Sequence, residues 1–140
     1  MENKKSNVAG IIPLAGYPSD FGMPWHDVLV PIGPNFLAVE RSLQECAYAG
    51  CQTIWLICPK EIEPLIKNRI GDWIEDPMFL HLKETWNSHL KKGIPIFYVP
   101  VSPKDYGIRD SLVWSMLYGA RTVKAFTSNL SQHLNPKKYF

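Results

Sequence analysis

Three short apolar runs without a charged residue set the strongest limit on how this chain can fold. They cover residues 8–14 (VAGIIPL), 53–58 (TIWLIC) and 94–101 (IPIFYVPV). Runs of this length that are continuously apolar, rather than alternating, are typical of strands buried on both faces of a parallel sheet. Pro13 lacks the backbone donor that a central strand needs, so we place it at the end of the first strand.

Segments with helical periodicity separate these strands. Apolar residues recur every three or four positions in residues 34–49, 59–70, 76–92 and 108–126, which predicts a helix in each segment. The last of these segments carries Leu112, Met116, Leu117 and Ala120. Strands that alternate with helices imply an α/β fold whose parallel strands are joined by right-handed crossovers.

Composition excludes several classes of protein. The 140 residues fit one domain of ordinary globular composition, 46% hydrophobic and 20% charged. A formal net charge of +2 gives no reason to expect a nucleic acid or a membrane surface as partner. No stretch approaches the ~20 apolar residues that a membrane span needs. Three cysteines, an odd number without a C-x-x-C pair, favour reduced thiols and a cytoplasmic protein.

The domain organisation leaves two explanations open. We assign residues 1–126 to an α/β domain, and residues 127–140 to a polar tail or to the start of a missing continuation. A parallel sheet of three strands is thin. Either the chain is one half of a larger domain, or it is a small protein that a homo-oligomer completes.

The long segment after the first strand is the first candidate site. In an open parallel sheet, ligands bind beyond the carboxyl ends of the strands. Residues 15–33 follow such an end and contain Gly16 and Gly22. Glycines there let backbone N–H groups approach a phosphate without a Cβ in the way. The alternative is that these glycines only relieve turns.

Four motifs follow one another along the first 57 residues, and their order and spacing matter more than any one of them. These are I-I-P-L-A-G at residues 11–16, V-L-V-P-I-G-P at 28–34, a helix that ends in Ala49-Gly50, and T-I-W-L-I at 53–57. In order and spacing they resemble the beginning of the sugar-phosphate nucleotidyltransferases, which make nucleotide sugars. The resemblance implies a three-layer α/β/α, Rossmann-like GT-A fold with a parallel sheet, here incomplete. It also implies that V-P-V-S-P at 99–103, followed by Gly107, holds the nucleotide base.

The resemblance and the residues around it give a set of candidate nucleotide-binding residues. Arg109 and Asp110 are added to the set because they begin the last helix, where backbone N–H groups can hold an anion. Asp110 there can contact a base or ribose, or simply favour the helix N-terminus. The full set is Leu14, Ala15, Gly16, Tyr17, Gly22, Ser102, Pro103, Gly107, Arg109 and Asp110.

The chain departs from the family at its cations. No Arg or Lys lies between Gly16 and Pro24, and Asp27 stands where the family has a lysine. In the family these cations neutralise the triphosphate and the leaving pyrophosphate, which is most of the catalysis. A Mg²⁺ ion that bridges Asp27 to phosphate would restore the positive charge that the family's lysine supplies at this position. Asp27 is therefore the candidate catalytic or metal-binding residue.

Two hypotheses about function therefore stand side by side. In the first, the chain binds a nucleoside triphosphate or nucleotide sugar and, with Mg²⁺, transfers a nucleotidyl group to a sugar phosphate. In the second, the same fold is an inactive nucleotide-binding or regulatory module that needs no cofactor.

Other residue patterns favour structural roles. We expect Cys46, Cys51 and Cys58 to be buried thiols rather than a zinc site, and His81 and His89 to be surface histidines. His26 beside Asp27 invites an acid–base interpretation, and Trp25 can stack on a base or pack. The tryptophans that we expect in the core are Trp55, Trp86 and Trp114.

Overall fold

The sheet is open and mostly parallel, as the sequence predicts. A computed structural model describes residues 8–16, 22, 24, 26–77, 93–105 and 111–134. Its main sheet has the strand order β1-β4-β6-β5. The parallel strands are β1 (Ala9–Pro13), β4 (Thr53–Pro59) and β6 (Gly93–Val101), and β5 (Trp73–Glu75) pairs with β6 in the antiparallel sense.

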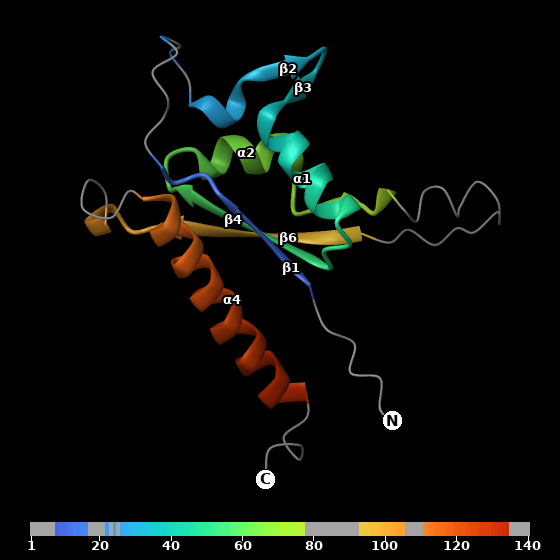
Figure 1. Ribbon diagram of the computed structural model, residues 1–140, viewed down its shortest axis with the longest axis vertical. Coiled ribbons are helices and arrows are strands. Elements are labelled where there is room, and N and C mark those ends of the chain that lie inside the picture. Colours follow the sequence, from blue (N-terminus) through green and yellow to red (C-terminus); the bar gives the residue numbers. More distant parts are fainter. Residues whose placement is uncertain are drawn as a thin grey trace, which may run out of the picture.

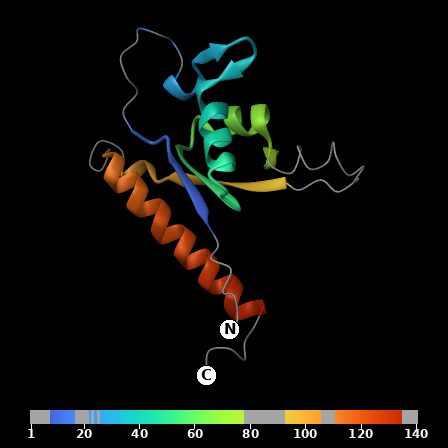
Figure 2. The ribbon, with the colours of Figure 1, turned by 45° about the vertical axis from the view of Figure 1, so that its right-hand side comes forward.

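Helices cover both faces of this sheet. On one face lie α1 (Ala38–Tyr48) and α2 (Glu63–Ile70), and on the other lies α4 (Leu112–Leu134) (Figures 1 and 2). The described residues thus form an α/β fold with helices, sheet and helix in three layers.

The central strand β4 explains why its sequence has no charged residue. Ile54, Leu56 and Cys58 belong to the core under α1 and α2, and each is 0% exposed. Trp55 and Ile57 belong to a second core, against which α4 packs with Tyr118 and Val123. Since successive side chains point to opposite faces, both faces of the strand must be apolar. The predicted burial on both faces is confirmed, and so is the core position of Trp55.

Pro13 ends β1, as predicted, and lies on the open side of the strand. The Val8 carbonyl accepts a hydrogen bond from Gln52 N, and Leu14 N donates one to Ile57 O. Backbone groups alternate along a strand, so those of Pro13 point away from β4. Within the described part of the chain no strand pairs with that edge. The missing N–H of Pro13 therefore interrupts no hydrogen bond of the sheet.

Two helix starts differ from the prediction. The first helix begins at Ala38 rather than at residue 34, because Phe36–Leu37 (β3) pairs with Pro31–Gly33 (β2) as a small hairpin. Asn35 turns this hairpin with a φ of 54°. The second helix begins at Glu63 rather than at Pro59, which still belongs to β4.

The larger apolar residues that the sequence shows along α4 are not the ones that face the sheet. Leu112, Met116 and Leu117 are 60%, 48% and 59% exposed, respectively. The face that meets the sheet contains Ser115, which is buried, and Gly119. A Cβ on Gly119 would lie 2.9 Å from Cγ2 of Ile11, so α4 approaches β1 too closely for a larger residue. Small residues, rather than the larger apolar ones, define the contact.

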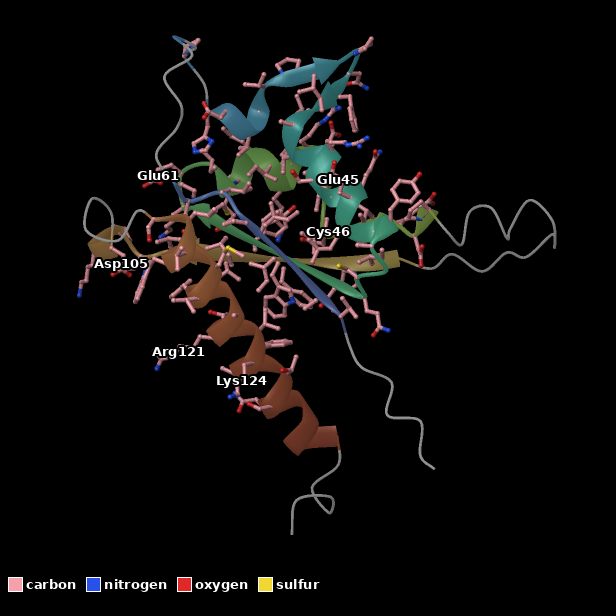
Figure 3. All side chains as sticks on the ribbon, viewed as in Figure 1. Glu45, Cys46, Glu61, Asp105, Arg121 and Lys124 are labelled. Atoms are coloured by element: carbon pink, nitrogen blue, oxygen red, sulfur yellow. The ribbon has the colours of Figure 1, made fainter. Side chains whose placement is uncertain are left out.

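The last helix is also longer than expected. It continues to Leu134, so residues 127–134 are helical and do not form an irregular tail. Arg121 and Lys124 point away from the sheet (Figure 3). Trp114 is half-buried, which is less than a core position requires, and Trp86 lies outside the described residues.

Candidate functional site

The parallel strands bring three loops to one edge of the sheet. Residues 14–16 follow β1, Lys60 and Glu61 follow β4, and residues 102–105 follow β6. Figure 3 shows Glu61 and Asp105 at this carboxyl edge. Neighbouring strands lie about 4.8 Å apart, so the first and third loops are separated by roughly 10 Å. A ligand the size of a nucleotide can span that separation.

The loop after β1 offers a ligand its backbone rather than its side chains. Leu14 is only 8% exposed and belongs to the core, and its N–H donates to the Ile57 carbonyl at 2.7 Å. That N–H is thus occupied. Ala15 packs against the core under α4. A Cβ built on Gly16 would meet no described atom within 4 Å, so the space beside it is open.

Gly22 differs from Gly16 in its backbone conformation. Its φ is +64°, in the left-handed region that glycine adopts without strain. A Cβ on Gly22 would also meet nothing within 4 Å among the described residues. A turn role thus explains Gly22, whereas the conformation of Gly16 does not require glycine.

The loop after β6 begins with a short turn. Pro103–Asp105 forms a 3-10 helix (η2), closed by a hydrogen bond of 2.9 Å from Asp105 N to the Ser102 carbonyl. Ser102 is half-buried and Pro103 is exposed. Four other candidate residues lie outside the described residues, namely Tyr17, Gly107, Arg109 and Asp110. Trp25, His81 and His89 lie outside them too.

His26 and Asp27 stand at the start of a second 3-10 helix (η1, Asp27–Leu29). His26 Nδ1 accepts a hydrogen bond of 3.4 Å from Val28 N and so caps this helix. His26 Nε2 is buried and has no hydrogen-bond partner in the described structure. Burial lowers the pKa of His26, and the Asp27 charge opposes this only in part. The imidazole is therefore a neutral structural cap, which does not favour an acid–base pair with Asp27.

Sequence reasoning missed two cations at the carboxyl edge. Lys60 follows β4 directly and Lys104 lies in η2, and both are exposed. The sequence analysis expected phosphate-binding cations in the segment after β1 and at Arg109, and neither expectation points to these two lysines. The signal that finds them is a basic residue just past the end of any predicted parallel strand. Glu61 and Asp105 lie beside them in sequence, so the edge carries charges of both signs.

A cavity of about 470 Å³ lies away from this edge, between α1, α2 and β5. Two of its charged residues, Glu40 and Arg69, hydrogen-bond to each other. Arg69 donates to Glu40 at 3.1 Å and to the Asn35 carbonyl at 2.7 Å, and Glu40 accepts from Leu37 N at 2.7 Å. These bonds cap α1 and tie it to α2, which gives the polar groups of the cavity a structural role.

Comparison of the chain with models of protein families, with curated proteins and with solved structures finds no match. Among the described residues, no three His, Cys, Asp or Glu side chains lie close enough together to hold a metal ion. No helix in the described ranges has the length and apolar character to span a membrane. What the fold itself defines is an α/β protein with an open, mostly parallel sheet.

Proposed function

We propose that this chain binds a nucleotide or a nucleotide sugar at the carboxyl edge of its sheet. The observation that carries the proposal is the open space at Gly16, directly after the buried strand β1. Backbone N–H groups can approach a phosphate there, as no Cβ stands in the way. The turn at residues 102–105, two strands further along the sheet, offers a surface for the base.

The placement of the helices supports this edge. The helix after β1 lies on one face of the sheet and the helix after β6 lies on the other (Figure 1). Ligands of open α/β sheets bind where the connections change face in this way. This rule points to the carboxyl ends of β1 and β4, next to Gly16.

The fuller form of the proposal is nucleotidyl transfer to a sugar phosphate. Mg²⁺ would neutralise the triphosphate, held by phosphate oxygens and by the Asp27 carboxylate, since this ion commonly takes one or two protein carboxylates plus substrate phosphates. Lys60 and Lys104 are the cations at the carboxyl edge that can attract the polyphosphate. The second candidate is a binding module without turnover, favoured by the lack of Arg and Lys between Gly16 and Pro24.

The test measures thermal stability of the chain with each of the four ribonucleoside triphosphates and with a nucleotide sugar, with and without Mg²⁺. We expect at least one ligand to raise Tm, and Gly16→Val to weaken its binding tenfold or more. Gly33→Val is the matched control, because a Cβ there makes an ordinary contact of 3.7 Å in β2, away from the edge. Unchanged stability with every ligand would remove the proposal.

A measurement of turnover distinguishes a nucleotidyl-transferring enzyme from a binding module without activity. Release of pyrophosphate from the bound triphosphate, dependent on both Mg²⁺ and a sugar 1-phosphate, supports nucleotidyl transfer. A rise in Tm without pyrophosphate release, across the common hexose 1-phosphates, supports the binding module.

A further inference from the structure

Helix α1 ends in a turn that brings two cysteines together. Gly50 has a φ of +81°, its N–H donates to the Ala47 carbonyl at 3.0 Å, and Cys51 N donates to the Cys46 carbonyl at 3.1 Å. These two bonds define a Schellman motif, in which the side chains at the two ends touch and are commonly apolar. Here the two ends are Cys46 and Cys51.

The two thiols share one space beneath β1. They are in hydrogen-bonding contact. A Cβ built on Gly10 would lie 2.9 Å from Sγ of Cys46 and 3.2 Å from Sγ of Cys51, so both sulfurs lie against the same point of the β1 backbone. Figure 3 shows Cys46 at the end of α1, beside β1. Glycine at position 10 thus leaves room for the pair.

Both thiols can be reached, and the third cysteine is remote. Cys46 is half-buried, and Cys51, although only 8% exposed, lines a cavity of about 230 Å³ together with Gly50 and Gln52. Cys58 is 0% exposed and lies near the opposite end of β4. Only one pairing of the three thiols is therefore within reach in the folded chain.

We propose that Cys46 and Cys51 form a reversible disulfide site, which closes the last turn of α1 onto the start of β4. A main-chain hydrogen bond already joins the two residues, which suits the α-carbon separation of 4.4–6.8 Å that disulfides need. The site lies at the amino end of β1, so it is independent of the nucleotide proposal.

The reaction balances with a small-molecule disulfide as the oxidant. The Cys46 thiolate attacks one sulfur of the oxidant, forms a mixed disulfide and releases one thiol. The Cys51 thiolate then attacks Cys46 Sγ and releases the second thiol. Two protein thiols are oxidised, the oxidant is reduced to two thiols, and both protein protons end on the released thiols.

The local electrostatics make this exchange slow at neutral pH. Burial raises the pKa of Cys46, and the neighbouring Cys51 and Glu45 raise it further. The thiolate fraction is accordingly small at pH 7, and the exchange accelerates as pH rises toward that pKa.

The experiment equilibrates the full chain in glutathione redox buffers, quenches with acid, alkylates with N-ethylmaleimide in denaturant and measures intact mass. The oxidised wild type should take up one N-ethylmaleimide per chain, whereas the reduced chain takes up three. Digestion of the oxidised chain should yield a peptide that links Cys46 to Cys51. After reduction, the chain should again take up three N-ethylmaleimides. Cys46→Ser and Cys51→Ala should abolish the link. Cys58→Ser is the matched control and should keep it.

A second measurement shows whether the fold makes the site. The same equilibrium in 6 M urea should favour the disulfide at least tenfold less than in the native chain, because the Schellman turn no longer holds the thiols together. Equal equilibria in both states would overturn the proposal. So would three free thiols in strongly oxidising buffer, a bond that involves Cys58, or cross-links only between chains.

Discussion

At the scale of single residues, the two nitrogens of His26 have different surroundings. Nδ1 caps η1, whereas Nε2 is buried without a hydrogen-bond partner in the described part of the chain. Burial lowers the pKa of His26 below its usual 6.5, so the unfolded chain binds the proton more readily than the folded chain. Hence protonation opposes folding. We expect the free energy of unfolding to fall as pH drops below 6.5 through the folded pKa.

The check is urea denaturation at several pH values between 5.5 and 7.5, with His26→Asn as the comparison. Asn keeps a side-chain acceptor for Val28 N but does not titrate in this range. The free energy of unfolding of the variant should depend less steeply on pH than that of the wild type. An identical slope in both proteins would show that the imidazole is not desolvated.

Tyr98 gives a second prediction at this scale, in the alkaline range. Its hydroxyl donates to the Gly71 carbonyl at 2.6 Å, and the Lys67 ammonium lies 5.6 Å from the ring centroid. Burial, with the nearby Asp72 charge, raises the pKa of Tyr98 to about 12. A raised folded pKa means that stability is complete below pH 10 and is lost as pH rises from 10 through 12.

Tyr98→Phe removes this hydrogen bond and leaves the Gly71 carbonyl without it. We expect the variant to lose about 1–2 kcal/mol of unfolding free energy at pH 7. In a pH titration followed by absorbance at 295 nm, which reports tyrosine ionisation, the variant should lack one of the tyrosines that ionise at high pH in the wild type. A variant as stable as the wild type would mean that water replaces the hydroxyl at no cost.

At the scale of elements, the contact of α4 with the sheet depends on Gly119. A Cβ there would lie 2.9 Å from Cγ2 of Ile11 and 3.0 Å from Cδ1 of Ile57, both in strands. Gly119→Val should thus lower the free energy of unfolding by about 3 kcal/mol, because the helix must move outward or the isoleucines must leave their rotamers. Chemical denaturation monitored by tryptophan fluorescence measures the loss.

The matched control on the same helix is Leu117→Val. Leu117 is 59% exposed, so its replacement should change stability by no more than about 0.5 kcal/mol. If Leu117→Val lowered the free energy of unfolding and Gly119→Val left it unchanged, the helix would pack through its larger apolar residues instead.

The elements that sequence reasoning found are those whose burial leaves a pattern. Every residue of 54–58 is at most 3% exposed, and such a strand can contain nothing but apolar side chains. The short strands at Trp73–Glu75 and Phe36–Leu37 leave no such pattern, because they are too short to show one and each exists only through pairing, the first with β6 and the second with β2. Hydrophobic periodicity does not identify the contact face of α4, because the close approach to the sheet selects Ser115 and Gly119, which are not large apolar residues.

The candidate site was predictable to a similar extent. The position of Gly16 follows from the strand that precedes it, and the sequence is enough to place it at the carboxyl edge. The occupied N–H of Leu14 was not predictable, because it depends on the register of β1 against β4. Lys60 and Lys104 lie at the same edge because β4 and β6 are parallel neighbours in the sheet, and a local motif does not contain the strand order.

At the scale of the whole molecule, stability should be highest in β4 and lowest at the end of α4. β4 has a strand on each side and a core on each face, so its amides open only on global unfolding. The Phe126 ring contacts Trp55 and Phe97, each with centroids 5.5 Å apart, whereas residues 127–129 are exposed. A helical end without packing is marginal in water.

Hydrogen exchange tests this gradient along α4. Amides of residues 130–134 should exchange at least a hundredfold faster than those of 118–123, and β4 amides slowest of all. A chain cut after Ser128 should keep the stability of the full chain within about 0.5 kcal/mol, since the cut leaves the contacts of the Phe126 ring with Trp55 and Phe97 intact. Protection that stays uniform to Leu134, and falls when the protein is diluted, would mean instead that another copy covers the end of α4 in solution. The gradient and its dependence on concentration thus distinguish a helix end that lies free from one that belongs to an interface.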